Sequence, residues 1–300
     1  MQSSYNTSTL ASSRCQKVDR GFTLIELLVV ISIIAMLISI LLPALGMARI
    51  SAKQITEMAA GRQLAQVLTM YQDDYKGYFI SGDFQPDSNT AVQGYDGTVL
   101  TDSHANFFQR TARGRYAYRI GTYAGGIYKG MTHVGDTLQY VASDSPTDFE
   151  LYIASLAPSF GLNSEYLSSM EFPHSGMQLE QIDPTWRDEV AYRTAVEVPS
   201  PSSMIAFSSA RTYIPGDDEY LGYYYVRAPY GFGNTDWSAA EFSRFGADNA
   251  DWGRVDPRFH DASVVGFIDG HAQAMKLDAM RDMRLWSKEA QLANNANYNP

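Results

Sequence analysis

The chain of 300 residues contains one cysteine, Cys15, and carries 23 Lys and Arg residues against 33 Asp and Glu residues. Because Cys15 has no second thiol to pair with, a disulfide within the chain is excluded. An exported domain without disulfides has to be held by its hydrophobic core or by a metal. The net charge of −10 argues against nucleic-acid binding through an electropositive face.

Patterns typical of enzymes are also missing from the sequence. It has no nucleophile elbow, no Ser-x-x-Lys pattern and no glycine-rich phosphate-binding loop. His104, His133 and His174 are scattered without the spacing of metal ligands. We therefore predict that the protein is not an enzyme and has no cofactor, apart from the Ca²⁺ considered below.

One long apolar run is present, from Phe22 to Leu45, with Glu26 as its single charged residue. A helix of this length is about 36 Å long, which exceeds a hydrocarbon core of about 30 Å. The alternative is a secretory signal peptide. The run is longer than the apolar core of such peptides, however, and no clear small-residue cleavage site follows it.

The segment before this run, residues 1–21, carries Arg14, Lys17 and Arg20 against Asp19. Since Lys and Arg favour the cytoplasmic side of a membrane, we expect this segment inside the cell and the rest of the chain outside. A carboxylate such as Glu26 is costly in hydrocarbon and is a functional candidate by default. The sequence therefore predicts that Glu26 has a specific partner.

The residues Gly21-Phe22-Thr23-Leu24-Ile25-Glu26-Leu27-Leu28-Val29 closely resemble the processing motif of type IV prepilins and type II secretion pseudopilins. This resemblance implies cleavage by a prepilin peptidase after Gly21 and methylation of the new N-terminal residue, Phe22. It implies that Glu26 is the characteristic acid of the class. Pro43 matches the proline that interrupts the same helix in many members.

Charge pairing gives Glu26 a physical role within that resemblance. Cleavage creates an ammonium at Phe22, and Glu26 lies about one helical turn further on. When helices pack side by side, the acid of one subunit can meet the ammonium of its neighbour, and a buried pair is tolerable where a lone charge costs several kcal/mol. The alternative is that Glu26 extends to the lipid headgroups.

Beyond Pro43 the pattern of a helix resumes as an amphipathic stripe. Pro43 removes one backbone donor and tends to kink a helix. Gly77 is a usual helix terminator, so one helix is predicted from about residue 22 to about residue 74. Its membrane half is 22–45 and its soluble half is 46–76. The predicted stripe consists of Ile50, Ile55, Met58, Ala59, Leu64, Val67, Leu68, Tyr71 and Tyr75.

The remaining chain, residues 77–293, is predicted to be a β-rich domain followed by a disordered tail at 294–300. A hairpin is expected over residues 115–128 and strands at 203–208 and 223–226. The clearest hairpin is 264–277, where a two-residue Asp269-Gly270 loop joins two β-prone runs. A short helix is expected at 281–293. The predicted fold class is α+β, with a long N-terminal helix packed on an antiparallel sheet, as in pilins.

The last hairpin carries a second resemblance. His260 with Asp269-Gly270 resembles a His-to-Asp-Gly element near the C-terminus of large pilin-like proteins of planctomycete-type bacteria, in which nine residues separate the two parts. Here residues 261–268 give a separation of eight. One interpretation is architectural, with Asp269-Gly270 forming the turn. The other is metal binding by His260, Asp269 and His271.

A second possible metal site is the acidic run Asp217-Asp218-Glu219, which follows Pro215-Gly216. Carboxylate oxygens are the ligands that Ca²⁺ prefers, and some pseudopilins hold calcium in a loop of this region. The alternative interpretation is an ordinary solvated turn.

Three functions are compatible with these features. The first is a structural subunit of a type IV pilus-like filament or a type II secretion pseudopilus, whose partners are prepilin peptidase, other pilin subunits and the inner-membrane assembly platform. It implies a single-pass protein of the bacterial inner membrane with a periplasmic C-terminal domain. The second is a membrane-tethered minor pilin or adhesin whose Tyr-rich domain binds a surface ligand. The third is an anchored exported enzyme.

Overall fold

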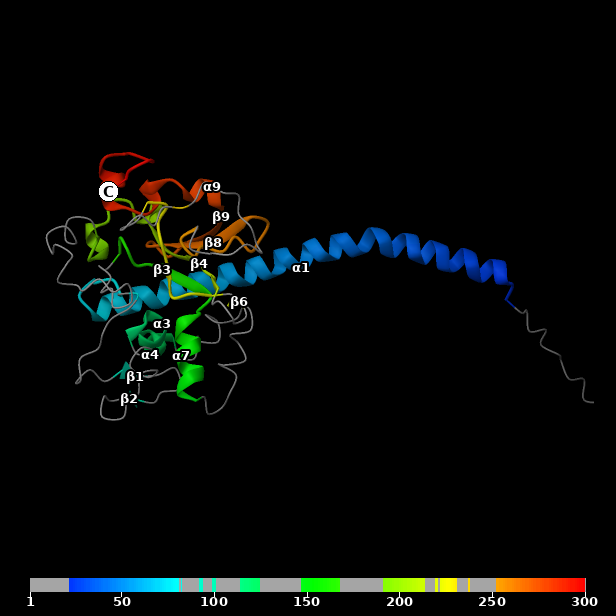
Figure 1. The fold of residues 1–300 in the computed structure, drawn as a ribbon, viewed down its shortest axis with the longest axis horizontal. Helices are drawn as coiled ribbons and strands as arrows, with labels where there is room; N and C mark the ends of the chain where they lie inside the picture. Colours follow the sequence, from blue (N-terminus) through cyan, green and yellow to red (C-terminus); the bar gives the residue numbers. More distant parts are fainter. Residues whose placement is uncertain are drawn as a thin grey trace, which may run out of the picture. The chain divides into compact units, whose positions relative to one another are not determined.

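The computed structural model describes residues 22–80, 82, 92–93, 99–100, 114–124, 147–167, 191–213, 219–220, 222–230, 237 and 252–299. The chain divides into two compact units, residues 1–49 and 50–300. The order of the elements can be followed in Figure 1. The first, α1 (Leu24–Asp74), is a continuous helix of 51 residues that contains Pro43.

The second unit is built on a five-stranded sheet with the order β7-β3-β4-β8-β9. Its strands are β3 (Phe160–Asn163), β4 (Ile205–Ser209), β7 (Tyr225–Val226), β8 (Ala262–Phe267) and β9 (Ala272–Lys276). Two small two-stranded sheets accompany it: β1 (Val92–Gln93) with β2 (Val99–Leu100), and β5 (Thr212–Tyr213) with β6 (Glu219–Tyr220). Short helices complete the described part: α3 (Tyr116–Arg119), α4 (Gly121–Ala124), α7 (Asp148–Leu156), η3 (Ala195–Glu197), η4 (Pro201–Ser203), α9 (Leu277–Met280), η6 (Met283–Leu285) and α10 (Lys288–Leu292).

The sheet is mixed rather than purely antiparallel. β4 pairs antiparallel with β3 and β8, and β8 pairs antiparallel with β9. β3 and β7, however, are parallel, with Leu162 opposite Tyr225 and Asn163 opposite Val226. The α+β class with a long N-terminal helix is therefore confirmed, while the prediction of an entirely antiparallel sheet is wrong at this one pair.

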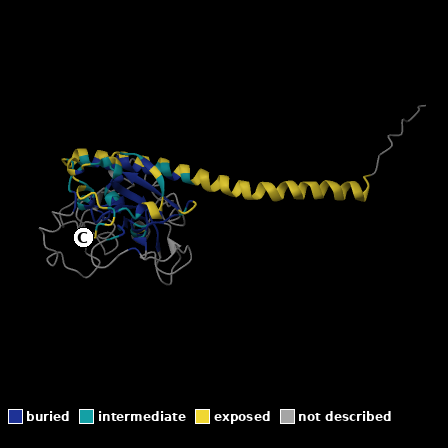
Figure 2. Ribbon diagram, turned by 90° about the horizontal axis from the view of Figure 1, so that it is seen from above, coloured by how far each residue is buried: buried dark blue, intermediate teal, exposed yellow. Residues whose placement is uncertain are grey.

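Both faces of the sheet are covered. Successive residues of a strand point to opposite faces, and Val264 and Val265 of β8 belong to different hydrophobic clusters. The first cluster contains Leu64 and Leu68 of α1 together with Phe207 of β4. The second gathers side chains of α9, η6 and α10 around Trp286. Figure 2 shows the strands as the buried centre of this unit.

The buried face of α1 differs from the predicted stripe. It consists of Glu57, Gly61, Leu64, Ala65, Val67, Leu68 and Tyr71, whereas Ile50, Ile55 and Tyr75 of the predicted stripe are exposed. The seam runs through residues 57, 61, 64, 68 and 71, at spacings of four and three. The seam begins with a polar residue, Glu57, and a glycine, Gly61. A search for apolar residues at helical spacing finds neither of them.

The end of α1 lies where Gly77 predicted it. Gly77 donates its backbone N–H to the carbonyl of Gln72 at 2.7 Å, a six-to-one bond typical of a helix C-terminus. Lys76 and Gly77 both have positive φ, +55° and +83°. The left-handed turn is thus shared between the two residues.

The final hairpin is confirmed, but its loop has three residues instead of two. Phe267 donates its backbone N–H to the carbonyl of His271, and Gly270 donates to the carbonyl of Phe267 at 3.0 Å. Gly270 has φ +92°. A three-residue loop of this kind, in which a turn is followed by a left-handed glycine, is a common hairpin connection.

One local prediction is wrong. The hairpin expected over 115–128 is replaced in its described part, residues 115–124, by the single-turn helices α3 and α4, and residues 125–128 lie outside the described residues. Alternation over four or five residues fits one helical turn as well as a strand. Within the predicted tail 294–300, the carbonyl of Ala296 accepts a hydrogen bond from the backbone N–H of Met283 at 2.9 Å. The C-terminal helix is present as the short α10.

Candidate functional site: the start of helix α1

The first turn of α1 is closed by a reciprocal capping arrangement. The backbone N–H and the hydroxyl of Thr23 both donate to Oε2 of Glu26, at 2.9 and 2.8 Å. The backbone N–H of Glu26 in turn donates to the hydroxyl oxygen of Thr23 at 3.2 Å. This is the capping box of a Thr followed three residues later by a Glu. The carboxylate is therefore held at the positive end of the helix dipole.

Phe22, the residue before this box, is 73% exposed. Gly21 lies outside the described residues. Three residues lie between Phe22 and Glu26, and α1 begins among them, at Leu24. Phe22 therefore precedes the helix, and Glu26 lies in its first turn.

The apolar residues of α1 from Leu24 to Leu45 are exposed in the isolated chain, and Figure 2 shows this stretch as continuously exposed. Among the residues that the structure describes, α1 is the one helix long and apolar enough to cross a membrane. An apolar surface of this extent is unfavourable in water and marks a site of membrane or protein contact. The predicted transmembrane segment coincides with it.

Pro43 lies inside α1 without ending it. Because proline has no N–H, the carbonyl one turn earlier loses its usual donor. Ser39, at that position, donates its hydroxyl to the carbonyl of Met36 at 2.8 Å. Despite the lost backbone hydrogen bond, α1 continues through Pro43 as one helix from Leu24 to Asp74.

A buried ionic cluster that the sequence analysis missed anchors the soluble half. Glu57 of α1 is fully buried. Its carboxylate accepts a hydrogen bond from the hydroxyl of Ser209 in β4, and its Oε2 lies 3.7 Å from Nη1 of Arg258. Ser209 also accepts a bond from the backbone N–H of Val264 in β8 at 3.1 Å. The Ser209 side chain of β4 thus bonds both to Glu57 of α1 and to Val264 of β8.

The cluster continues away from the helix. Nε of Arg258 lies 2.8 Å from Oδ2 of Asp256, and Nη2 of Arg211 lies 3.4 Å from Oδ1 of Asp256. All four charged side chains are at most 5% exposed. Two acids and two bases leave the cluster neutral, as burial of ions requires. The sequence feature that could have indicated this cluster is Glu57, an acidic residue four positions before Gly61 on the otherwise apolar buried face of α1.

The candidate metal ligands do not form one site. His260 precedes β8, and Asp269 and His271 follow it, so the six-residue strand separates them by about 20 Å. Nδ1 of His271 instead lies 2.5 Å from Oδ1 of Asp269, and the His271 ring stacks on Phe267. The described residues contain no group of three His, Cys, Asp or Glu side chains that could hold a metal ion.

The acidic run falls largely outside the described residues. Asp217 and Asp218 are not described, and Glu219 is placed by its backbone in β6, opposite Tyr213. His260 itself has φ +50° and is exposed. Its backbone therefore takes part in the tight turn that leads into β8.

Comparison with protein families identifies the class of the N-terminal segment. Residues 16–42 match the prokaryotic N-terminal methylation motif, which is typical of type IV prepilin-like proteins. The prepilin-type N-terminus predicted from Gly21, Phe22 and Glu26 is thus confirmed as a motif, and it supports a pilin-like or pseudopilin role. Comparison with curated proteins gave no match, and comparison with solved structures gave none.

Proposed function

We propose that the protein is a structural subunit of a type IV pilus-like filament or of a type II secretion pseudopilus. Prepilin peptidase removes residues 1–21 and methylates Phe22, and the subunit then assembles with other pilin subunits through α1 at the inner-membrane platform. The observation that carries the proposal is the coincidence of the methylation motif with the exposed apolar start of α1.

The charges of the segment support assembly through α1. Glu26 is the single ionisable side chain between Phe22 and Pro43, and a lone carboxylate in hydrocarbon is costly. Thr23 donates both of its hydrogen bonds to Oε2 of Glu26. In the proposed filament, Oε1 of Glu26 therefore accepts a hydrogen bond from the N-terminal ammonium of Phe22 in a neighbouring subunit. The pair sets axial register more than it adds net stability.

Before assembly, the proposed subunit is a single-pass protein of the inner membrane with its C-terminal domain in the periplasm. Its basic segment 1–21 keeps the N-terminus in the cytoplasm. The role is structural, and the soluble domain is the part presented on the filament surface.

The variant Glu26→Gln tests the proposal in full-length protein co-expressed with a prepilin peptidase and an assembly platform. We expect membrane insertion and cleavage after Gly21 to persist, while filament yield falls at least tenfold because the Phe22 ammonium has no counter-ion. The N-terminal peptide mass and electron microscopy are the measurements.

The matched control is Ser39→Ala, which removes a hydroxyl that bonds only its own helix in the isolated chain, and it should assemble normally. Wild-type protein that retains Met1 or begins at an unmethylated internal residue would contradict the processing step. Unchanged yield and subunit spacing in Glu26→Gln would contradict the assembly step.

A further inference from the structure

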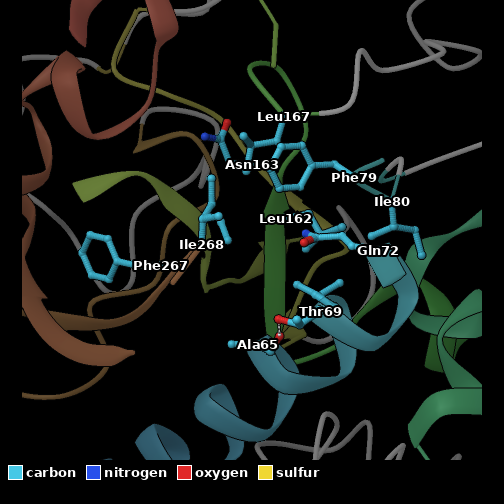
Figure 3. A pocket seen from close by; sticks show the side chains of 12 residues that line it. Ala65, Thr69, Gln72, Phe79, Ile80, Leu162, Asn163, Leu167, Phe267 and Ile268 are labelled. Carbon is cyan, nitrogen blue, oxygen red and sulfur yellow. Dashed lines mark hydrogen bonds between the residues drawn. The ribbon is translucent and has the colours of Figure 1, made fainter. Parts of the chain in front are cut away.

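The hollow between the soluble half of α1 and the sheet is too small for an organic ligand. Figure 3 shows Asn163 and Leu167 on one side of it and Ala65 with Thr69 on the other. Its volume of about 20 Å³ has room for about one water molecule. A binding activity of this part of the domain therefore has to use an exposed surface, and the last turn of α1, beyond Gln72, offers one.

The end of α1 exposes a tyrosine ring on a buried support. Tyr75 is 51% exposed, and its ring stacks on that of Tyr71, with 4.2 Å between the ring centroids and 13° between the planes. Tyr71 is buried, and its ring also makes an edge contact with the ring of Tyr123 in α4 at 5.9 Å. Because one face of the Tyr75 ring lies on Tyr71, its opposite face is the one turned to solvent.

Polar groups from three helices converge beside this ring. Nη2 of Arg119 in α3 donates to the hydroxyl oxygen of Tyr71 at 2.8 Å, and the hydroxyl of Tyr123 in α4 donates to Oδ2 of Asp74 at 2.8 Å. Burial raises the pKa of both Tyr71 and Tyr123, and the nearby Tyr75 phenol raises it further. Three phenols, a guanidinium and a carboxylate therefore lie together at the end of α1.

This combination of an aromatic face and fixed polar groups suits a sugar ring. The axial C–H bonds of a pyranose form a flat, weakly positive face, which is attracted to the negative face of an aromatic ring. Sugar hydroxyls donate hydrogen bonds, and Asp74 is an exposed acceptor whose bond from Tyr123 uses Oδ2 and leaves Oδ1 for a second donor.

The charges favour a neutral sugar over an acidic one. Asp74 and Arg119 contribute one negative and one positive charge to the cluster, and the chain as a whole carries a net charge of −10. A polyanion would therefore be repelled by the protein without gaining a strongly basic site.

We propose that the end of α1 binds a neutral polysaccharide, with one sugar ring stacked on Tyr75 and its hydroxyls donating to Asp74. Polymers of β-1,4-linked glucose match best, because all their ring substituents are equatorial and leave both ring faces flat. The contacts of Tyr75 with Tyr71 hold the ring in place before binding, so little side-chain freedom is lost. The site gives the soluble domain a binding activity separate from cleavage and assembly, which use the start of α1.

The test uses the full-length chain in lipid nanodiscs with ¹³C-labelled tyrosine rings, and cellotetraose as the probe. Cellotetraose should shift the ring signals of Tyr75 and Tyr123 saturably in nuclear magnetic resonance spectra. The signals of Tyr298, which packs against the other hydrophobic cluster, should not move. Tetragalacturonate has a carboxylate on each ring and should bind about fivefold more weakly, because the chain is acidic.

Three variants complete the test. Tyr75→Ala removes the stacking face and should weaken cellotetraose binding about tenfold, whereas Tyr75→Trp keeps an aromatic face and should bind about as well as wild type. The matched control is Phe149→Ala, which removes a ring of similar exposure, 49%, from α7. It should leave the affinity unchanged.

Four results would overturn the proposal. They are no saturable shift at up to about 10 mM cellotetraose, equal affinities of Tyr75→Ala and Phe149→Ala, tighter binding of tetragalacturonate, and Tyr75 signals that shift with protein concentration without sugar. The last result would assign this surface to a second copy of the chain. The measurements involve neither the peptidase nor a filament, so their outcome is independent of the proposed function.

Discussion

Glu26 and Glu57 of α1 lie in opposite environments. Glu26 is exposed, and among the described residues it is bonded to Thr23 of its own first turn, so in the proposed filament its counter-ion comes from a neighbouring subunit. Glu57 is fully buried and already lies beside Arg258 and Ser209. Under the proposed function, Glu26 makes contacts between subunits, whereas Glu57 makes contacts within one subunit, although both lie on the same helix.

Glu165, two residues after the end of β3, is a buried acid whose titration should change the free energy of unfolding. Burial raises the pKa of Glu165 from 4.5 to about 7, opposed by Arg227 at 3.6 Å and by the backbone N–H of Ala228. The folded state therefore holds a proton that the unfolded chain releases above pH 4.5. Its stabilising contribution is complete below pH 4.5 and declines by about 3 kcal/mol as the pH rises to about 7.

The variant Glu165→Gln isolates this effect, because a neutral amide does not titrate. We expect the free energy of unfolding of Glu165→Gln, relative to wild type, to rise by about 3 kcal/mol between pH 4.5 and pH 7.5. Urea denaturation at several pH values measures the difference, and other carboxylates cancel in the comparison. A difference that is constant with pH would show that Glu165 titrates normally in the folded protein.

At the scale of elements, the close approach of β4 and β8 depends on a glycine. A Cβ at Gly266 would overlap the ring of Phe207, and the pairing of the two strands shifts register between Ile205 and Phe207. Gly266 thus leaves the space in which the Phe207 ring lies. The same ring contacts α1, where a Cβ added at Gly61 would lie 3.4 Å from Phe207 Cε2.

Two alanine substitutions around this ring should have different outcomes. Gly266→Ala should destabilise the domain by about 1–3 kcal/mol, because the ring has to move within a packed core. Gly61→Ala should be close to neutral, since its Cβ makes an ordinary contact and alanine favours a helix by up to about 1 kcal/mol. Thermal unfolding followed by circular dichroism measures both. Equal losses in the two variants would contradict the proposed role of Gly266.

The elements differ in how well the sequence predicts them. The long apolar run, the glycine after α1 and the Asp-Gly turn of the last hairpin are local signals, and the structure has the corresponding elements. The short helix α3 is stabilised by burial of Tyr116 and Tyr118, which the local sequence pattern does not reveal. The parallel pair of β3 and β7 joins residues about 60 positions apart, beyond the reach of periodicity.

The functional residues also differ in how well the sequence predicts them. Gly21, Phe22 and Glu26 form a contiguous motif that a sequence shows directly. Glu57 and Tyr71 acquire their importance from partners far along the chain, Arg258 and Arg119. A long-range ion pair or hydrogen bond leaves no spacing pattern, so these residues emerge only from the fold.

At the scale of the whole molecule, the boundary between the two compact units falls inside α1, after Arg49. Every buried residue of the helix lies beyond that boundary, beginning at Glu57. The domain of residues 50–300 therefore contains both hydrophobic clusters and all members of the Glu57 ionic cluster. Membrane anchoring and folding of the domain should be separable.

Two truncations test this separation. A chain of residues 50–300 should be soluble and unfold cooperatively, because it keeps every buried residue of α1 that the structure describes. A chain of residues 62–300 loses Glu57 and Gly61 and leaves Arg258 and Arg211 with Asp256 as their one acid in the ionic cluster. It should be about 3–5 kcal/mol less stable, the usual consequence of breaking a buried ion pair. Urea denaturation compares the two chains. If they proved equally stable, the first turns of the soluble half would contribute nothing to the domain and the buried carboxylate would not anchor the helix.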